Sequence, residues 1–423
     1  MLSMNLNIAG LPKTNECIAD FFFLVKSQLL IWLAANRIGI DSANETVLRH
    51  AAGDFFIVPI NHSKIGTQQL KIITEQFENQ HELGRFIDVD ITNHEGKPVS
   101  SGKSKLCFYC KAFPAIECRR LKRHSIAELQ RFQQKEIKNY LENRKLNELS
   151  RKLSILAIRA ILYEISLSPK PGLVSALNSG VHTDMNYRTF IDSTAIISSY
   201  FQELVQKGFR CETENLPNAL ALIRQTGLQM ETEMFAQTNG VNTQKGLIFL
   251  IGISLFSCGY IFNKNEKFSE LVFIETVKQI CANLQSELSN QPAESKSHSV
   301  QCFSQFKVGG IRFEAENGFP TVFNCALPIL AQVNLLDDKT LTLTLLAIMS
   351  ELDDTNILYR SDMETLQLLK QKCKFALHNF SEENYSEIIN FCNAKRISPG
   401  GAADLLSISI FIYLLKTEFN YDF

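Results

Sequence analysis

The sequence has no excess of charge of either sign, because its 423 residues carry 43 Lys and Arg against 44 Asp and Glu. A chain so balanced has no general attraction to nucleic acid or to an anionic membrane surface, so we expect neither as a partner. The sequence also contains no internal repeat, which excludes a repeat architecture.

A secretory leader and membrane-length apolar runs are lacking as well. The first ten residues alternate apolar and polar and have no basic region of the kind that opens a signal peptide. The most apolar segments, 246–260 and 405–415, are shorter than the ~20 residues of a membrane span. Eleven cysteines, an odd number, favour reduced thiols over a disulfide framework. We therefore expect a cytoplasmic protein in which these apolar segments are buried helices.

The length predicts two or three domains, and the first part of the chain has a mixed pattern. Apolar residues alternate over 2–8 and 87–91, as in half-buried strands, and 55–60 is typical of a short buried strand. Helical spacing covers 17–38, and an amphipathic helix with a capping-box start is predicted over 125–150. These patterns predict an α+β domain.

From about residue 150 onward the apolar period is helical and almost nothing alternates. Segments 246–260, 341–352 and 405–415 are apolar nearly all round, as expected of central helices. The polar stretch 286–304 is predicted to be a loop. The sequence thus predicts two domains, an α+β domain over 1–145 and an all-α helical bundle over 146–423.

Five polar islands interrupt the apolar second domain. Burying their charged groups unpaired would cost about 2–7 kcal/mol each, and one shared cleft for a polyanionic substrate would explain them together. The islands are residues 164–172 with 182–185, 240–246, 312–320, 353–360 and 398–404.

The basic and glycine groups of the islands suit phosphate. Helix N-termini carry free N–H groups and about half a positive charge, and Gly400 and Gly401 directly precede an apolar helix. Lys170 and Lys245 are the candidate phosphate ligands. The alternatives are a simple Pro-Gly-Gly turn, solvated surface lysines and, for Asp404, a residue that complements the helix dipole. The candidate substrate-binding residues are Lys170, His182, Asp184, Asn242, Thr243, Lys245, Arg312, Arg360, Gly400, Gly401 and Asp404.

Two acidic pairs are the candidate catalytic groups, Glu314 with Glu316 and Asp353 with Asp354. Such carboxylates hold Mg²⁺ on a triphosphate or act as general acid and base. Helix capping or a solvated acidic patch is the alternative for each pair. Together the islands point to an enzyme that acts on a nucleotide.

In the first domain, Asp88 and Asp90 share one face of a predicted strand. Two such carboxylates suit Mg²⁺-dependent nucleotidyl transfer, and Arg85 is placed to hold phosphate. The alternative is an exposed strand face with incidental aspartates.

Cysteine and histidine follow in the pattern Cys107-x2-Cys110-x7-Cys118-x5-His124. These are zinc-ligand residue types, but the intervals differ from those of a standard zinc module. We interpret them as ordinary reduced cysteines and predict no metal site. The basic run 119–123 suits an acidic partner, or it is a solvated surface face.

Six stretches carry a resemblance to a known family. From about residue 150 the chain resembles the triphosphoribosyl-dephospho-coenzyme A synthases, in the family's order. The stretches are SPKPGLV, the HTDM of 182–185, GVNTQKG, EAENGFPTV, DDTNILYR and SPGGAADLL. The first domain resembles the citrate lyase holo-acyl-carrier-protein synthases, or phosphoribosyl-dephospho-coenzyme A transferases. That match is His81-x-x-Gly84-Arg85-x-x-Asp88-x-Asp90 with the Cys107, Cys110, Cys118 and His124 block.

The resemblance implies a bifunctional enzyme. The second domain would join ATP, with Mg²⁺, to 3′-dephospho-coenzyme A and release adenine. The first would transfer the phosphoribosyl-dephospho-coenzyme A group to a serine of the acyl carrier (gamma) subunit of citrate lyase and release diphosphate. Alternatives are a first domain that only docks the carrier protein, or a product that serves malonate decarboxylase. The transferase family usually has an Arg-, Asp-, Glu- and Gln-rich segment before the first strand, where this sequence opens. Transferase activity is therefore expected to depend on that segment if it binds substrate.

Overall fold

The computed structural model describes residues 1–61, 65–100, 102, 105–264, 267–289, 298–333 and 335–419. The chain divides into two compact units, Met1–Lys145 and Leu146–Phe423, each with its own hydrophobic core. Each unit is described by itself below.

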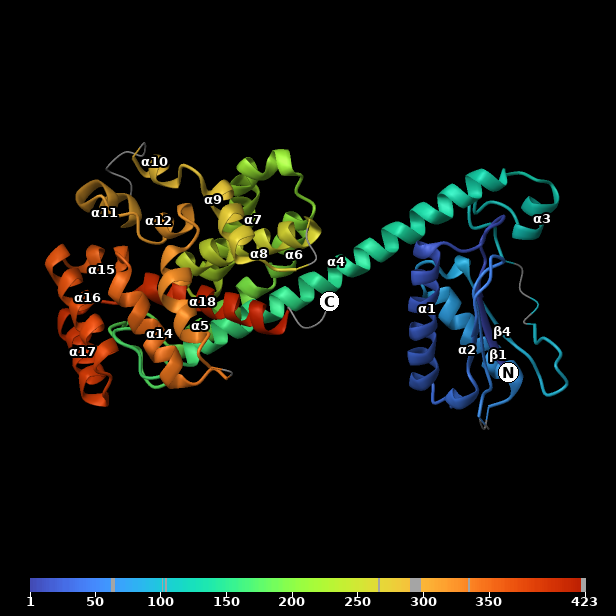
Figure 1. The fold of residues 1–423 in the computed structure, drawn as a ribbon, viewed down its shortest axis with the longest axis horizontal. Helices are drawn as coiled ribbons and strands as arrows, with labels where there is room; N and C mark the ends of the chain where they lie inside the picture. The colour runs from blue at the N-terminus through green and yellow to red at the C-terminus, as the bar shows by residue number, and fades with distance from the viewer. Residues whose placement is uncertain are drawn as a thin grey trace. The chain divides into compact units, whose positions relative to one another are not determined.

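The first unit is built on a four-stranded antiparallel sheet with the strand order β2-β3-β1-β4. Helix α1 connects β1 to β2 and α2 connects β3 to β4, which gives the split β-α-β order of ferredoxin-like folds. Both helices cover the same apolar face of the sheet (Figure 1). The bounds are β1 Leu2–Leu6, α1 Glu16–Ala35, β2 Thr46–Leu48, β3 Phe55–Val58, α2 Thr67–Gln80 and β4 Ile87–Ile91.

The predicted strands and helix of this unit are confirmed. In β4 the residues Ile87, Val89 and Ile91 are buried, while Asp88 and Asp90 face the other side. The N–H of Val89 on this edge strand donates to Oε1 of Glu78 at 2.8 Å, and its carbonyl accepts from Nζ of Lys71 at 2.8 Å. Two side chains of α2 thus satisfy backbone groups that an edge strand would leave open.

After β4 come a short helix α3, Ala115–Arg120, and the 41-residue helix α4, Ile126–Ser166. The predicted capping box is present, since the Ser125 and Glu128 side chains bond each other's backbone N–H at 3.2 and 2.9 Å. The sequence suggested two separate helices here. The structure joins them because no Gly or Pro interrupts 126–166, and Pro169 follows the end.

The second unit is helical throughout its described residues. Its helices are α5 Tyr187–Ser198, α6 Phe201–Phe209, α7 Ala219–Gln237, α8 Lys245–Lys264, α9 Glu270–Cys281, α10 Leu284–Ser289, α11 His298–Phe306, α12 Ile311–Glu316, α13 Leu327–Leu330, α14 Asp338–Glu351, α15 Thr355–Arg360, α16 Met363–His378, α17 Glu382–Lys395 and α18 Gly400–Glu418. Short 3₁₀ and π turns lie at Thr213–Asn218 and Val322–Ala326.

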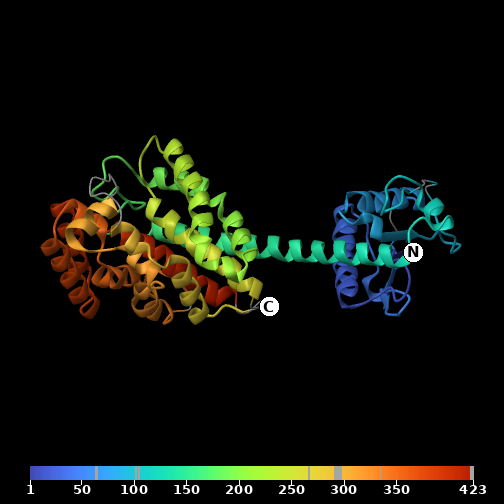
Figure 2. The same cartoon turned by 90° about the horizontal axis from the view of Figure 1, so that it is seen from above.

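Helix α18 runs through the middle of this unit and packs on α8, α14 and α15 (Figures 1 and 2). The central positions predicted for α8, α14 and α18 are confirmed by their buried residues. The loop predicted over 286–304 is wrong for its described ends, where α10 and α11 form. In α11 the buried Val300 and Cys302 give the segment an apolar face. Residues 290–297 lie outside the described residues.

Helices α1, α8 and α18 are long and apolar enough to cross a membrane by length and composition. They extend beyond the apolar runs seen in the sequence, which corrects the expectation that those segments are too short. In α8 and α18, 83% and 72% of the most apolar window is buried inside the unit. Their apolar surface is therefore used in the core, as expected of buried helices.

Candidate active site

The polar islands of the second unit meet where the first turns of α8 and α18 touch. A Cβ built on Gly246 would overlap Oδ2 of Asp404, so the carboxyl group of Asp404 rests against the backbone of α8. Glycine is required at 246 for this approach. Two islands that are 158 positions apart in sequence (404 minus 246) thus form one surface.

Asp354 fastens α15 to α18 at the same junction. Its carboxylate caps α15 by accepting from the N–H of Asn356 at 2.9 Å, and it accepts from the N–H of Ala402 at 3.0 Å. A Cβ on Gly401 would lie 3.1 Å from the carboxylate, so the glycine allows the close approach. The N–H of Ala402, at the start of α18, is therefore bonded to Asp354 and not available to the phosphate predicted at the Gly400–Gly401 turn.

A buried ion pair lies beside these carboxyl groups. Nζ of Lys170 donates to Oε1 of Glu164 at 2.5 Å and to the Glu164 carbonyl at 2.8 Å. Both residues are almost fully buried. Lys170, predicted to bind phosphate, therefore has its charge balanced by a residue at the end of α4.

The two aspartates of the junction differ in how they are held. Burial raises the pKa of Asp354 to about 6, against the opposing effect of its backbone hydrogen bonds. Burial, with the charges of Asp354 and Glu164, raises the pKa of Asp404 well above its ordinary value. Asp404 makes no hydrogen bond or ion pair within the part of the chain that is described. It is a carboxyl group with raised basicity and a free hydrogen-bonding edge.

His182 joins the loop after α4 to the loop before α18. A ring nitrogen, Nε2, lies 2.9 Å from Oγ of Ser398, and Nδ1 lies 3.7 Å from Oδ1 of Asp184. Burial and then the charge of Arg360 lower the pKa of His182. Arg360, Asp184 and His182, all predicted to bind substrate, are thus near one another, and His182 is neutral at neutral pH.

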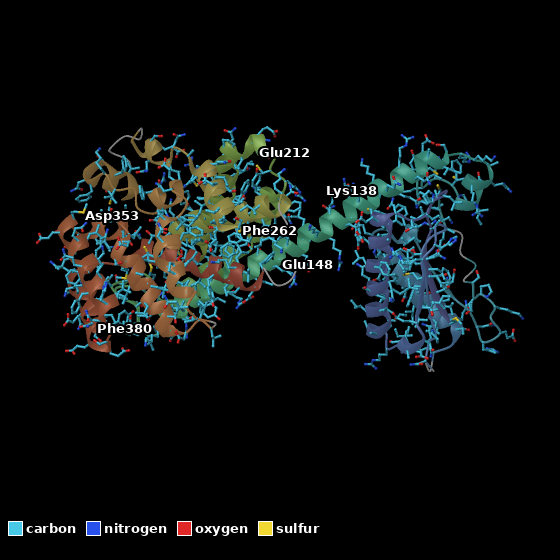
Figure 3. All side chains as sticks on the ribbon, in the orientation of Figure 1. Lys138, Glu148, Glu212, Phe262, Asp353 and Phe380 are labelled. Atoms are coloured by element: carbon cyan, nitrogen blue, oxygen red, sulfur yellow. The ribbon has the colours of Figure 1, made fainter. Side chains whose placement is uncertain are left out.

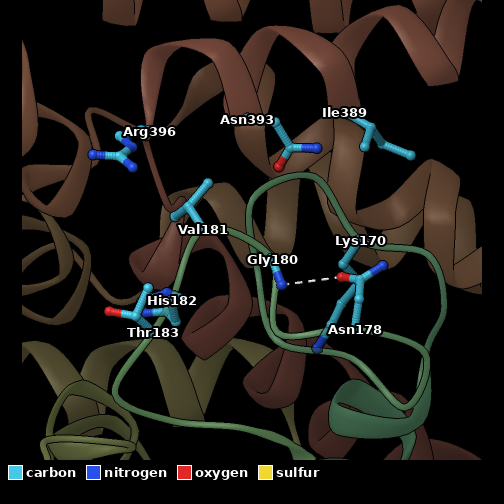
Figure 4. Close-up of a pocket in the computed structure, with 9 residues that line it drawn as sticks. All are labelled: Lys170, Asn178, Gly180, Val181, His182, Thr183, Ile389, Asn393 and Arg396. Atoms are coloured by element: carbon cyan, nitrogen blue, oxygen red, sulfur yellow. Dashed lines mark hydrogen bonds between the residues drawn. The ribbon is translucent and has the colours of Figure 1, made fainter.

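A polar hollow of about 340 Å³ opens beside His182 and Lys170 (Figure 4). The loop of 170–183 forms one wall, where the N–H of Gly180 donates to Asn178 at 3.0 Å, and α17 forms the other. Arg396 supplies a further positive charge from the end of α17. The lining residues are Lys170, Asn178, Gly180, Val181, His182, Thr183, Ile389, Asn393 and Arg396.

The island before α8 contributes polar groups to the junction. Asn242 accepts from the N–H of Lys245 at 3.2 Å, and Lys245 pairs with Glu231 at 2.8 Å. The hydroxyl of Thr243 is buried and has no hydrogen-bond partner among the described residues. A buried polar atom of this kind is expected to bond a ligand or a water.

Arg312 comes from α12 and lies 6.0 Å from the ring of Phe249 on α8. Burial lowers the pKa of its guanidinium. The arginine predicted to bind substrate is therefore close to the first turns of α8.

The remaining predicted carboxylates have partners of their own. Glu314 is buried and accepts from the N–H and Oγ1 of Thr321 at 3.0 and 2.5 Å, and Glu316 accepts from Gln285 at 2.6 Å. Asp353 lies at the surface and pairs with Lys370 at 2.6 Å (Figure 3). Catalytic roles for these three stay predictions, and the contacts favour Asp354 and Asp404 as the central pair.

Sequence reasoning missed four residues of this site. Glu164 and Ser398 open two of the islands, so their place in those motifs was a usable signal. Asn393 and Arg396 lie in a polar helix end with no distinguishing pattern. Only the packing of α17 against the loop of 170–183 brings them to the hollow.

In the first unit the predicted aspartates face the same side of β4, and each has a lysine. Asp88 lies 3.2 Å from Nζ of Lys105, and Asp90 lies 3.0 Å from Nζ of Lys71. Lys105 also bonds Glu78 at 2.6 Å, and burial raises the pKa of Glu78. The strand face is thus a set of alternating charges.

Arg85 and His81 border this face. Nη2 of Arg85 donates to the Leu106 carbonyl at 2.6 Å, while its Nε is buried without a partner among the described residues. His81 lies between Gln28 and Tyr140, and burial lowers its pKa to about 4. Arg85 therefore keeps one unused donor for an anionic group.

Known proteins match both units. A family model described as ATP:dephospho-CoA triphosphoribosyl transferase (CitG) matches residues 150–423. A second, described as apo-citrate lyase phosphoribosyl-dephospho-CoA transferase (CitX), matches residues 1–140.

Among individual relatives, Protein CitXG of Leuconostoc mesenteroides subsp. cremoris is 29% identical over 97% of this chain and 90% of its own length. Protein CitXG of Haemophilus influenzae is 29% identical over the same shares. A probable 2-(5''-triphosphoribosyl)-3'-dephosphocoenzyme-A synthase of Malonomonas rubra is 35% identical over 64% of this chain and 90% of its own length. The chain therefore belongs to the ATP:dephospho-CoA triphosphoribosyl transferase family through residues 150–423, fused to a CitX-family transferase over residues 1–140.

Proposed function

We propose that the second unit joins ATP to 3′-dephospho-coenzyme A with loss of adenine, and that the first unit attaches the product to a carrier protein. The observation that carries the first step is the junction of α8 and α18. There the unpartnered, high-pKa carboxyl of Asp404 lies among groups from five polar islands.

In the first step a ribose hydroxyl of dephospho-coenzyme A, the 2′-hydroxyl, forms a bond to C1 of the ATP ribose. The C1–N bond to adenine breaks, and its electron pair leaves with adenine, which takes up a proton. Asp404 accepts the proton of the attacking hydroxyl, because a carboxylate with a raised pKa is a stronger base. The cationic character that develops at C1 is stabilised by nearby negative charge.

The triphosphate requires cations and N–H donors. We propose that Arg396 and the hollow beside His182 bind phosphate, with Arg360 at its edge. The Thr243 hydroxyl, Lys245 and Arg312 at the start of α8 are the second set of donors. Mg²⁺ on the triphosphate would neutralise phosphate charge, and Asp404 is the carboxyl group that is free to meet it.

In the second step a serine hydroxyl of the acyl carrier (gamma) subunit of citrate lyase attacks the phosphate next to the ribose, and diphosphate leaves. Asp88 and Asp90 would serve this transfer, and the free Nε of Arg85 would hold phosphate. Both steps would take place in the cytoplasm. The alternative for the first unit is carrier docking without catalysis, which the lysine partners of both aspartates favour.

The test is the mass of the carrier subunit. The full chain, ATP, Mg²⁺, 3′-dephospho-coenzyme A and apo carrier protein are incubated together and analysed by intact-protein mass spectrometry. A gain of one phosphoribosyl-dephospho-coenzyme A group on the carrier, absent when its acceptor serine is replaced by alanine, is the expected result. Formation of the free triphosphoribosyl product with an unmodified carrier would instead favour docking.

A further inference from the structure

Four zinc-ligand side chains converge in the first unit, outside the charged face of β4. The ligand atoms of Cys107, Cys110, Cys118 and His124 all lie within 4.8 Å of one another. Within the described chain this is the only group of three or more His, Cys, Asp or Glu residues that meets in this way. The set is thus singular among eleven cysteines that otherwise have no disulfide.

The spacing of the ligand atoms fits one tetrahedral ion. Zinc binds thiolate sulfur at about 2.3 Å and imidazole nitrogen at about 2.0 Å. Two sulfurs on one tetrahedral zinc are therefore about 3.8 Å apart by the same geometry. Sγ of Cys110 and Sγ of Cys118 are 3.6 Å apart, which is well beyond the ~2.05 Å of a disulfide.

The backbone holds the ligands in two tight turns. The N–H of Lys111 donates to the Cys107 carbonyl at 3.0 Å, which closes the Cys107–Cys110 turn. The N–H of Arg123 donates to the Cys118 carbonyl at 3.0 Å and brings the following His124 back to the same place. The separated intervals of the sequence thus become one cluster.

His124 supplies an independent sign of a missing partner. Its Nε2 is buried and has no hydrogen-bond partner in the described part of the chain. The ring is held by Tyr109, whose ring centroid lies 4.9 Å away. A buried imidazole nitrogen left unbonded is costly, and an ion or a water usually explains it.

We propose that Cys107, Cys110, Cys118 and His124 bind one zinc ion that fixes the segment between β4 and α4. Each cysteine binds as a thiolate and releases its proton to solvent, and no oxidation or reduction takes place. All four positions are then filled by protein, as in structural zinc sites, which leaves no open position for catalysis. This corrects our sequence interpretation of ordinary reduced cysteines.

The ion would act on the charged face through its neighbours. Lys105 and Leu106 directly precede the first ligand, and they bond Glu78, Asp88 and Arg85. The basic run 119–123 lies between the third and fourth ligands. Zinc would therefore fix both the lysine and arginine contacts of β4 and the basic surface.

The test measures metal directly and needs no activity. The full chain is purified from cells grown with added zinc, and bound zinc is measured by inductively coupled plasma mass spectrometry. Metal-free protein is then titrated with Co²⁺, which gives strong thiolate charge-transfer and tetrahedral d–d bands in a three-sulfur site. About one zinc per chain and these bands are expected.

Cys110→Ser and His124→Asn are the test variants, and Cys17→Ser is the matched control. Cys110 and Cys17 are both partly buried, and both lie in the first unit. The control should keep about one zinc, while the two ligand variants should fall at least tenfold in zinc retained after dialysis against a mild chelator. Wild-type protein with no zinc and no cobalt bands would overturn the proposal, as would equal zinc content in all four proteins or a Cys110–Cys118 disulfide in freshly purified protein.

Discussion

Asp404 lies in the first turns of α18, where an acidic residue ordinarily complements the positive end of the helix dipole. Its carboxyl group turns instead toward Gly246 of α8 and shares a buried space with Asp354 and Glu164. The raised pKa follows from this company, since like charges close together in a low dielectric disfavour ionisation. The residue type was visible in the sequence, but its neighbours were not.

Replacing Asp404 with asparagine should lower adenine release on the order of 10²- to 10⁴-fold, because the proton acceptor is lost while the side-chain size is kept. The rate is measured with saturating ATP and 3′-dephospho-coenzyme A, and folding is checked by circular dichroism. Asp192→Asn, at an exposed position of α5, is the control and should retain wild-type activity. Full activity in a folded Asp404→Asn protein would remove Asp404 from the mechanism.

Gly246→Ala tests the same junction from the other helix. The added Cβ would overlap the Asp404 carboxyl, so Asp404 must move and activity should fall at least tenfold. Gly227→Ala in α7 is the matched control, because its Cβ would make an ordinary contact at 3.8 Å with Ile248. We expect it to fold with unchanged activity. Equal activities of the two variants would contradict the close approach seen at Gly246.

Asp354 predicts a pH dependence of stability. Its pKa of about 6 in the folded protein exceeds the ordinary value of 3.8, so protonation favours folding. Its stabilising contribution is complete below about pH 4 and is lost as the pH rises through 6, a change of at most about 3 kcal/mol. Urea unfolding of wild type and Asp354→Asn at pH 4.5 and 7.5 measures this. The stability advantage of wild type over the variant should be larger at pH 4.5, and an advantage that grows toward pH 7.5 would contradict the assignment.

At the scale of elements, local pattern predicted most of what formed. Alternation marked β1 and β4, and continuous apolar runs marked α8, α14 and α18. These patterns report burial on one face or on all faces, which is a local property. They do not report which helix ends meet, so the junction of α8 and α18 became visible only in the structure.

The edge strand β4 gives an element-scale prediction. Glu78→Ala removes the acceptor for the Val89 N–H and a partner of Lys105, so the first unit should lose about 1–3 kcal/mol of stability. The chain has a single tryptophan, Trp32 on α1, which donates to the Ile73 carbonyl of α2 at 3.1 Å. Its fluorescence therefore reports unfolding of this unit during a urea titration.

Glu82→Ala is the control for this measurement, because Glu82 is exposed in the turn after α2. It should unfold within about 0.5 kcal/mol of wild type. If Glu78→Ala unfolds at the same urea concentration as this control, the side-chain capping of β4 contributes nothing to stability.

At the scale of the whole molecule, two compact units match two family models, and each has its own candidate site. The motifs of both families were readable from the sequence because they cluster at short spacing. Contacts across long intervals were not readable. The hollow beside α17 and the meeting of Cys107 with His124 depend on packing that no local pattern encodes.

The two activities should be separable by single substitutions. Asp88→Asn should leave adenine release unchanged and abolish modification of the carrier protein, since it changes only the first unit. Asp404→Asn should do the reverse when the triphosphoribosyl product is supplied ready-made. Both are followed by mass spectrometry of nucleotides and carrier in one reaction. Loss of adenine release in a folded Asp88→Asn protein would show that the two sites are not independent.

Adenine release by the purified full chain tests the central claim most directly. The protein is incubated with ATP, Mg²⁺ and 3′-dephospho-coenzyme A, without carrier protein, and the products are separated and weighed by mass spectrometry. Free adenine in equal amount to a triphosphoribosyl adduct of dephospho-coenzyme A is the predicted result, and neither should form when either substrate is omitted. Folded protein that leaves ATP and dephospho-coenzyme A unchanged, or that cleaves ATP to phosphate without releasing adenine, would contradict the account.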